Sequence, residues 1–244
     1  MAIRKGKKKT GRLEIEDRLL GMVERASSKG ESLPGEPTLA NMLGVSRPSL
    51  REALARLERD GVIHRRKGSQ TFINKDALDL AGRFDQVGDF SEVLSEAGFV
   101  PSVEVLVEER IKMGSETANA FGCEVGTPVL RIVKRWLADG SPVRLAIDEV
   151  PLPSLDVKLP KGRSVLELVP HLTGQKVLWD LAVPGAVNAT KELSEWLDVP
   201  LRSALLVLEC IGISKAGERV FYAHDYYVPG AVRLGLIRTV DKLH

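Results

Sequence analysis

Arg47 and Arg51 lie four residues apart in a stretch whose apolar residues, among them Leu50 and Leu54, recur at helical spacing. Both arginines therefore project from one face of a predicted helix, near its N-terminal end. A guanidinium group donates two parallel hydrogen bonds that match O6 and N7 of guanine in the major groove of DNA. The residue types and their spacing indicate readout of base edges; the alternative is a charged, solvated helix face.

The residues before this pair predict a helix-turn-helix. A short helix over 38–43 is expected to end at Gly44, because glycine accepts the left-handed conformation at a helix C-terminus. Ser46 is expected to cap the second helix through its side-chain oxygen, and Pro48 falls in the first turn, where its missing N–H costs little. An amphipathic helix over 13–25 is expected to support the pair from behind.

Two short extended runs, 62–66 and 71–73, follow the second helix and enclose Gly68, which favours a hairpin tip. Lys67 and the two arginines before it make one side of this hairpin basic, so it suits a wing that lies against phosphates. Short helix, glycine turn, capped arginine helix and basic hairpin occur in this order. Together they predict a winged helix-turn-helix that binds double-stranded DNA.

The run LPGEPTLANMLGVSRPSLREALARLERDGVI resembles the motif LPSERELAxxLGVSRxTVREALxxLxxxGxI of the GntR family of bacterial transcription factors. The resemblance covers about the first third of the chain. It implies that the DNA contacts are made by Ser46, Arg47, Ser49 and Arg51 in the recognition helix and by Gly68 in the wing. Two departures are visible: Pro37 stands where the family has arginine, and Gly-Ser-Gln replaces Gly-x-Gly at the wing tip.

Charge divides the chain in two. Residues 1–75 carry 17 Lys/Arg and 9 Asp/Glu, a net charge of +8, whereas the remainder carries 18 and 24, a net charge of −6. A basic first third beside an acidic remainder favours one DNA-facing domain and a second domain with another task. The basic run over 4–9 is either an arm that touches DNA or a solubilising tail.

Length and composition favour two globular domains. The 244 residues are 43% hydrophobic and 28% charged, and no apolar run approaches the ~20 residues that cross a bilayer. Cys123 and Cys210 are not spaced as CxxC, and we expect them to be reduced in a cytoplasm. The four scattered histidines form no metal-binding pair, so we expect no metal site. No Ser/His/Asp set, carboxylate pair or phosphate loop is identifiable, so we expect no catalytic site, and no cofactor is expected.

The second part of the chain contains an internal repeat. A helix over 115–121 precedes predicted strands over 129–138 and 143–150, and a helix over 189–197 precedes predicted strands over 205–214 and 220–227. Asp148 and Asp225, like Gly140 and Gly217, are 77 residues apart. Both strand pairs are expected to be hairpins, so the fold class is α+β with a mainly antiparallel sheet and helices on one side. A cleft between the halves is a candidate ligand site; the alternative is a repeat that serves folding only.

Residues 90–240 resemble the UTRA effector domain of HutC-type GntR regulators, whose fold is like that of chorismate lyase. Arg135 with the turn ADGSP looks like the family's R-x-R-x-x-DG-x-P, and GRSVL at Ser164 looks like its serine-bearing helix start. In the family these residues grip acidic or phosphorylated effectors, and amides at a helix N-terminus favour an anion. An acidic position before the family's YLP matches Asp148 or Glu149.

Two departures bear on the effector. Leu137 replaces the second arginine, and Phe221 falls near a glutamate that the family often has. A less charged or partly aromatic ligand is therefore expected in place of an amino-sugar phosphate. The candidate walls are aromatic side chains, each of which has plain core packing as its alternative: Trp136, Trp179, Tyr222 and Tyr227.

Three classes of function are compatible with the sequence: a ligand-responsive dimeric regulator, an enzyme with a lyase-like second domain, and an effector-blind repressor. We expect the first, with a DNA-binding domain over 10–75, a linker over 76–89, and an effector-binding and dimerisation domain over 90–244. A homodimer would bind a palindromic operator with half-sites about 10 bp apart or a multiple of that distance. Repression is expected over activation because occupying a promoter needs no contact with polymerase.

Overall fold

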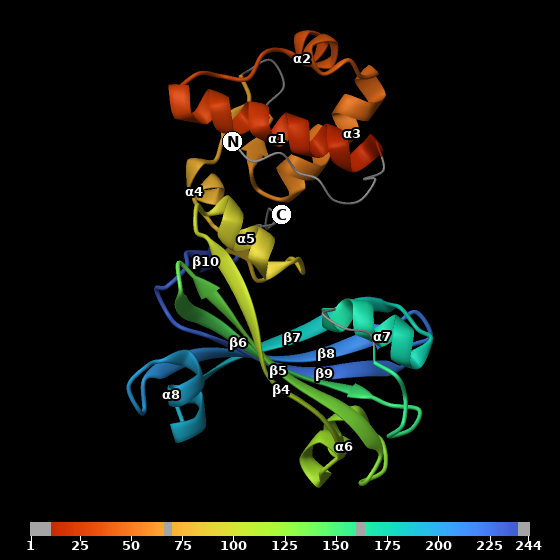
Figure 1. Cartoon of the computed structure of the whole chain (residues 1–244). Helices are drawn as coiled ribbons and strands as arrows, with labels where there is room; N and C mark the ends of the chain where they lie inside the picture. The colour runs from red at the N-terminus through yellow and green to blue at the C-terminus, as the bar shows by residue number, and fades with distance from the viewer. Residues whose placement is uncertain (1–10, 66–69, 160–163, 239–244) are drawn as a thin grey trace, which may run out of the picture. The chain divides into compact units, whose positions relative to one another are not determined.

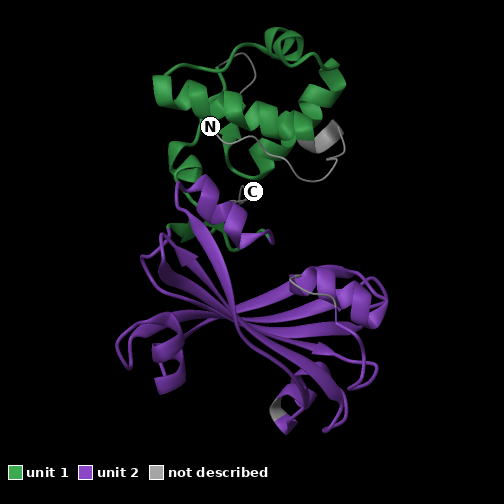
Figure 2. Cartoon of the chain, in the orientation of Figure 1, with its two compact units in different colours: residues 1–86, 233–244 green, residues 87–232 purple. Residues whose placement is uncertain are grey.

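The structure, a computed structural model, describes residues 11–65, 70–159 and 164–238 of the chain. It divides into two compact units, of which the first takes residues 1–86 with 233–244 and the second takes residues 87–232 (Figure 2). Each unit buries its own apolar residues. In the described part of the chain, no helix has both the length and the apolar character needed to cross a bilayer.

Three helices, which Figure 1 labels α1 to α3, open the first unit together with a small hairpin. These elements are α1 (Gly11–Lys29), α2 (Glu36–Leu43), α3 (Arg47–Arg59), β1 (Ile63–His64) and β2 (Phe72–Ile73). Gly44 ends α2 in the left-handed conformation, with φ of 65°, and Ser46 caps α3, as predicted. Helix α2 begins two residues earlier than predicted because Pro37 is accommodated in its first turn. The buried face of α3, with Leu50 and Leu54, packs against Leu19 of α1.

The last described residues of the chain belong to the first unit. The polar stretch after the hairpin forms α4 (Lys75–Leu78) and β3 (Gly82–Arg83), and β3 pairs in parallel with β10 (Leu234–Gly235). Arg83 donates a hydrogen bond of 2.6 Å from its Nη1 to the carbonyl oxygen of Asp60, the residue that ends α3. The stretch that leads out of the first unit is therefore tied to the C-terminal end of α3 and to β10.

Gly61 should report how closely the C-terminal segment packs on this unit. Gly61 has φ of 71°, and a Cβ built on it would lie 2.5 Å from Cγ2 of Ile237. We expect Gly61→Ala to lower the free energy of unfolding of the unit by about 2–4 kcal/mol, since backbone strain and overlap add. Gly30→Ala is the matched control, because Gly30 has φ of 67° and open space around its Cβ position. Equal losses for both variants in urea denaturation would contradict the packing of Ile237.

The second unit is built on a six-stranded antiparallel sheet of order β4-β5-β6-β9-β8-β7. The strands are β4 (Pro101–Lys112), β5 (Pro128–Ala138), β6 (Ser141–Pro151), β7 (Val177–Asn188), β8 (Ala204–Ser214) and β9 (Arg219–Tyr227). The predicted hairpins β5-β6 and β8-β9 are confirmed, and Gly140 and Gly217 turn them with φ of 83° and 82°. The repeat extends further: β4-α6-β5-β6 and β7-α8-β8-β9 are two halves that meet where β6 pairs with β9.

Helices cover both faces of this sheet, so the prediction that they lie on one side is wrong. The helices are α5 (Phe90–Glu96), α6 (Ser115–Phe121), α7 (Val165–Thr173) and α8 (Lys191–Leu197). Helices α6 and α8 pack on one face, where Phe121 meets Tyr222 and Leu193 meets Leu145. Helices α5 and α7 lie on the other face, where Phe90 contacts Trp136. The central strands are apolar toward both faces, so each face needs a cover.

We call these surfaces the α7 face and the α6–α8 face. Alternation along the paired strands assigns polar and charged residues to each of them. The α7 face carries Lys134, Arg144, Asp148, Asp180 and Asp225. The α6–α8 face carries Arg135, Glu149, Glu209, Tyr222 and His224.

Candidate nucleic-acid interface and ligand pocket

The N-terminal end of α3 presents the polar residues that the sequence singles out. The Ser46 Oγ accepts a hydrogen bond of 3.3 Å from the Ser49 N–H and lies 2.8 Å from the Ser49 Oγ. Arg47 and Arg51 are exposed, whereas Leu50 on the inner side is fully buried. The cap fixes where the helix begins, and the buried face fixes its rotation. Both arginines are therefore displayed on an exposed helix start.

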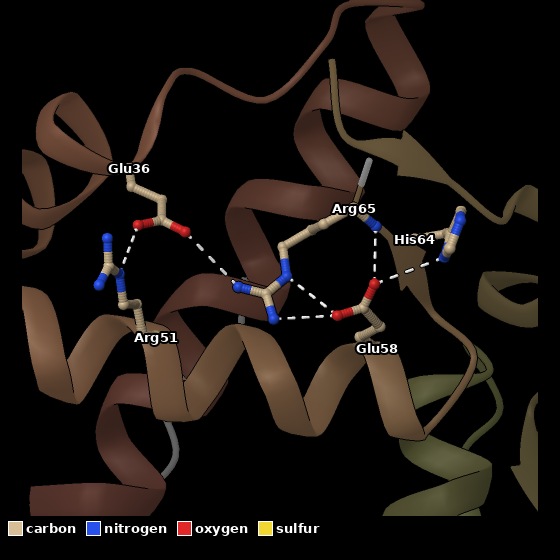
Figure 3. Close-up of polar contacts among 5 residues, drawn as sticks. All are labelled: Glu36, Arg51, Glu58, His64 and Arg65. Atoms are coloured by element: carbon tan, nitrogen blue, oxygen red, sulfur yellow. Dashed lines mark hydrogen bonds and ion pairs between the residues drawn. The ribbon is translucent and has the colours of Figure 1, made fainter. Parts of the chain in front are cut away.

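Arg51 belongs to a chain of ion pairs that joins α2, α3 and β1 (Figure 3). Its Nε donates to Oε2 of Glu36 at 2.8 Å, and Oε1 of Glu36 lies 3.5 Å from Nη1 of Arg65. Arg65 in turn donates two side-chain hydrogen bonds, of 3.0 and 2.9 Å, to Oε2 of Glu58. Oε1 of Glu58 also accepts the Arg65 N–H at 2.8 Å and lies 3.4 Å from Nδ1 of His64. One carboxylate thus holds both Arg51 and Arg65.

The electrostatics follow from these contacts. The hydrogen bond to Glu36 raises the pKa of Arg51 above its ordinary value, so the guanidinium stays charged. Partial burial acts to raise the pKa of Glu58, but the hydrogen bonds from Arg65 outweigh it and hold that pKa below its usual range. Arg51 keeps 68% of its side chain exposed, so its guanidinium can exchange Glu36 for another acceptor.

Sequence reasoning missed Glu36 and Glu58 as partners of these arginines. Glu36 precedes Arg51 by 15 residues and lies on another helix, so no helical spacing relates the two. Arg65 was predicted to belong to the basic side of the wing. Its side chain is instead directed toward Glu58 and Glu36, and 29% of it is exposed. The predicted wing contacts Lys67 and Gly68 lie outside the residues that the structure describes.

In the second unit, the α7 face holds two buried ion pairs. Nζ of Lys134 lies 3.3 Å from Oδ2 of Asp148, and Nη2 of Arg144 donates to Oδ2 of Asp225 at 2.7 Å. Burial acts to lower the pKa of Arg144, but the negative charge of Asp225 outweighs burial and raises that pKa above its ordinary value. The guanidinium is therefore charged at any ordinary pH. Burial raises the pKa of Asp148 above its usual range although Lys134 opposes the shift. Each cation of this face therefore has its own carboxylate.

Three aromatic rings surround the Arg144 guanidinium. Its Cζ lies 4.4 Å from the ring centre of Trp136, 5.0 Å from that of Phe90 and 5.4 Å from that of Tyr227. Such stacking adds about 0.5–2 kcal/mol per desolvated contact. The arginine thus joins Phe90, the first residue of α5, to the sheet.

A cavity of about 360 Å³ opens between α7 and β7. Its lining is mainly apolar, with one carboxylate and one amine: Val87, Leu166, Pro170, Lys176, Val177, Leu178 and Asp180. Burial and the nearby Asp225 raise the pKa of Asp180 to about 6. Its Oδ1 is buried and has no hydrogen-bond partner, and Asp180 has no ion pair with any described residue. Asp180 is partly buried, and a carboxylate with one buried, unbonded oxygen is costly unless something compensates its charge.

The structure divides the predicted effector residues between the two faces. Asp148 and Tyr227 lie on the α7 face, and Ser164 stands at the N-cap of α7 with an exposed side chain. The others lie on the α6–α8 face: Arg135, Glu149 and Tyr222. There, Arg135 donates to Glu104 at 2.7 Å and to the carbonyl oxygen of Trp196 at 2.8 Å, and the Tyr222 hydroxyl lies 3.0 Å from Oε1 of Glu209.

Three residues of the α7 face escaped the sequence analysis. Lys134 and Arg144 lie at even spacings from Trp136 and Asp148, so strand alternation would have placed them on this face. Asp180 belongs to β7, a strand that the analysis did not predict. The structure adds Lys134, Arg144 and Asp180 to Asp148 and Tyr227, and it separates them from Arg135.

The pKa of Asp180 leads to a stability prediction. Because its folded pKa, about 6, lies above the ordinary 3.8, the folded state binds the extra proton between these values and loses stability as the pH rises through them. Asp180→Asn removes that cost. We expect the variant to exceed the parent chain by about 1–2 kcal/mol at pH 7.5, after allowing for partial solvent screening, with the gap shrinking from pH 6 down to pH 4.

Urea denaturation at pH 7.5 and 4.5 measures this difference. Asp156→Asn, in an exposed turn, is the matched control and should change little at either pH. A loss of stability in Asp180→Asn at pH 7.5 would mean that the carboxylate already has a favourable partner.

Both units match known family models. The model described as "Bacterial regulatory proteins, gntR family" matches residues 12–73, and that of the UTRA domain matches residues 96–233. The HTH-type transcriptional repressor NagR of Bacillus subtilis (strain 168) is 28% identical over 119 residues, or 49% of this chain, and the match spans about half of NagR, 48%. The uncharacterized HTH-type transcriptional regulator YurK of the same organism is 24% identical over 192 residues, 78% of either chain.

Solved structures share the fold. The possible transcriptional regulator YydK from Bacillus subtilis superposes with a TM-score of 0.70 at 16% identity, over 96% of this chain and 100% of that chain. PhnF from Mycobacterium smegmatis superposes with a TM-score of 0.57 at 17% identity, over 93% of this chain and 100% of that chain. At these identities the likeness concerns the fold alone.

Proposed function

Because this chain belongs to the GntR family of bacterial regulatory proteins and carries the UTRA domain of its HutC-type members, we propose that it is an effector-controlled repressor that binds a palindromic operator as a homodimer. The chain is a DNA-binding transcriptional regulator by family. Its fold is α+β, with a helix-turn-helix unit and an antiparallel-sheet unit. The repressor assignment draws on relatives, among them NagR and a probable fructoselysine utilization operon repressor of Escherichia coli.

The exposed N-terminal end of α3 is the observation that carries the DNA-binding proposal. Arg47 and Arg51 stand on a capped, rotationally fixed helix start, the end of a recognition helix that reaches base edges in the major groove. Ser46 and Ser49 lie beside them, and Lys67 and Gly68 complete the proposed contacts from the wing. We assign DNA binding to residues 10–75, the linker to residues 76–89, and effector binding with dimerisation to residues 90–244.

The sheet edge at β7 supports dimerisation. Its outer residues Trp179, Leu181 and Val183 lie on one side of the strand and are 61%, 54% and 56% exposed. An edge strand also presents unpaired N–H and C=O groups, so a long apolar edge pairs readily with another chain. A second copy related by a two-fold axis would cover the same residues on both chains and would present two α3 helices to two half-sites.

The second unit is proposed to bind a small effector without turning it over, because regulation needs only a difference in affinity between DNA-bound and free states. The candidate residues are Asp148, Ser164 and Tyr227 from the sequence, with Asp180 from the structure. Arg135, Glu149 and Tyr222 stay proposals as well, on the α6–α8 face. We place the protein in the cytoplasm, where the chromosome is.

Two linked assays test this function. Selection of bound fragments from genomic DNA should yield a palindromic site, and a thermal-shift screen of metabolites should yield a ligand that releases it. DNA binding that no stabilising ligand alters would favour the effector-blind repressor. Chemical conversion of a bound ligand would favour the lyase-like enzyme.

A further inference from the structure

The cavity between α7 and β7 has the dimensions and lining of a small-molecule site. Its volume of about 360 Å³ falls within the range of ligand pockets. Leu166 and Pro170 of α7 face Val177 and Leu178 of β7 across it. These walls suit an apolar body and supply no hydrogen bonds from their side chains.

The charged side chains that the sheet strands place on the α7 face do not balance. Three carboxylates on the α7 face, those of Asp148, Asp180 and Asp225, accompany two cations. Lys134 is paired with Asp148 at 3.3 Å and Arg144 with Asp225 at 2.7 Å. Asp180 is left with a buried Oδ1 that no group of the described residues bonds. Among these strand residues one positive charge is missing, and the carboxylate left over, Asp180, lines the cavity.

Neither of the two nearby cations, Lys176 and Arg144, pairs with the Asp180 carboxylate. Lys176 lines the same cavity, but its side chain is exposed and forms no ion pair with a described residue. Arg144 is fixed by Asp225 and by the rings of Phe90, Trp136 and Tyr227, so it cannot turn to Asp180 without giving up these contacts. A ligand could supply the missing cation.

We propose that this cavity binds an effector with a cationic amine that pairs with Asp180 and an apolar or aromatic body that lies on Pro170, Val177 and Leu178. The inference rests on the proposed function of the second unit and names the chemical class of its effector. An anionic effector would meet the Asp180 carboxylate in the lining, with only the exposed amine of Lys176 there to offset it. A neutral ligand would leave the Asp180 charge uncompensated.

The test uses three probes of one shape and different charge: 2-phenylethylammonium, 2-phenylethanol and phenylacetate. Isothermal titration of the full chain at pH 7.5 should give a dissociation constant for the ammonium at least tenfold below that of the alcohol. Asp180→Asn should raise the value for the ammonium to that of the alcohol and leave the alcohol unchanged. Asp156→Asn, an exposed carboxylate replaced in the same way, should keep the full difference.

Three results would overturn the proposal. These are equal affinities of the ammonium and the alcohol, a preference for phenylacetate that Lys176→Met removes, and no binding of the ammonium. The proposed function fails by a different result. If the chain selects no operator in the absence of any ligand, DNA-binding regulation is refuted, whatever the cavity binds. A chain that selects its operator but shows no preference for the ammonium refutes only the effector class.

Discussion

Replacing Arg51 with alanine is expected to weaken operator binding by about 5- to 150-fold, which corresponds to about 1–3 kcal/mol, and to relax base preference at one position in each half-site. The reason is geometric. Arg51 is the more exposed end of the Glu36 ion pair, with 68% of its side chain exposed, and it projects from the helix start that enters the groove. Alanine removes the guanidinium group, which donates two parallel hydrogen bonds, but keeps the helix and its N-cap.

Two matched variants separate readout from charge. Arg51→Lys keeps the positive charge but lacks the planar fork, so it should hold on to nonspecific affinity and lose base preference. Arg59→Ala removes one exposed arginine at the other end of α3 and should leave base preference intact. Fluorescence anisotropy on the operator and on single-base variants measures both quantities. Unchanged preference in Arg51→Ala would show that α3 does not dock as proposed.

If the chain dimerises through β7 as proposed, Leu181→Lys in the exposed edge of that strand is expected to give a monomer and to lower operator affinity by about 100-fold or more. At a two-fold interface each copy contributes one lysine, so the substitution buries two positive charges and opposes association. A monomer has one DNA-binding unit, so the gain in affinity from binding two half-sites at once is lost. Light scattering coupled to gel filtration gives the mass, and binding to operators with one or two half-sites gives the loss of avidity.

Val105→Lys is the control for this substitution. Val105 is 55% exposed on β4, the strand at the opposite edge of the same sheet. The Val105→Lys substitution should leave both the mass of the protein in solution and its affinity for the operator unchanged. A monomeric Val105→Lys beside a dimeric Leu181→Lys would move the interface from β7 to β4.

The sequence predicted the elements whose signals are local. The helix-turn-helix has a glycine stop, a serine cap and a periodic apolar face within 22 residues, and all of these are confirmed. The hairpins β5-β6 and β8-β9 were predicted from their turn residues and alternation. The family resemblance added the regulatory function, which the comparisons bear out.

Elements without such signals were missed. Strand β7 contains Pro184 and Gly185, which argue against a strand, although an edge strand tolerates both. Strands β3 and β10 have two residues each and exist because they pair across 152 positions of sequence, which no local pattern reveals. The start of α7 at Ser164 was expected, but only from the family resemblance, because Pro170 inside this helix argues against a helix from the sequence alone.

The candidate site was only partly predictable for the same reason. Ser46 followed from its capping position and Arg51 from helix periodicity, but the ion pair between Glu36 and Arg51 depends on packing between α2 and α3. On the sheet, Arg135 was singled out by its motif, yet a strand alternates its side chains, and Arg135 points away from Lys134 and Trp136. Asp180 became visible only once β7 was placed beside β8.

The most direct test of the account is a competition measurement on the full chain, in which a fragment selected from genomic DNA competes with bulk DNA at 0.15 M salt. Readout by the arginines of α3 predicts a preference of about 1,000-fold or more for the selected fragment, which Arg51→Ala sharply reduces. Equal affinity for the selected fragment and for bulk DNA would contradict the account.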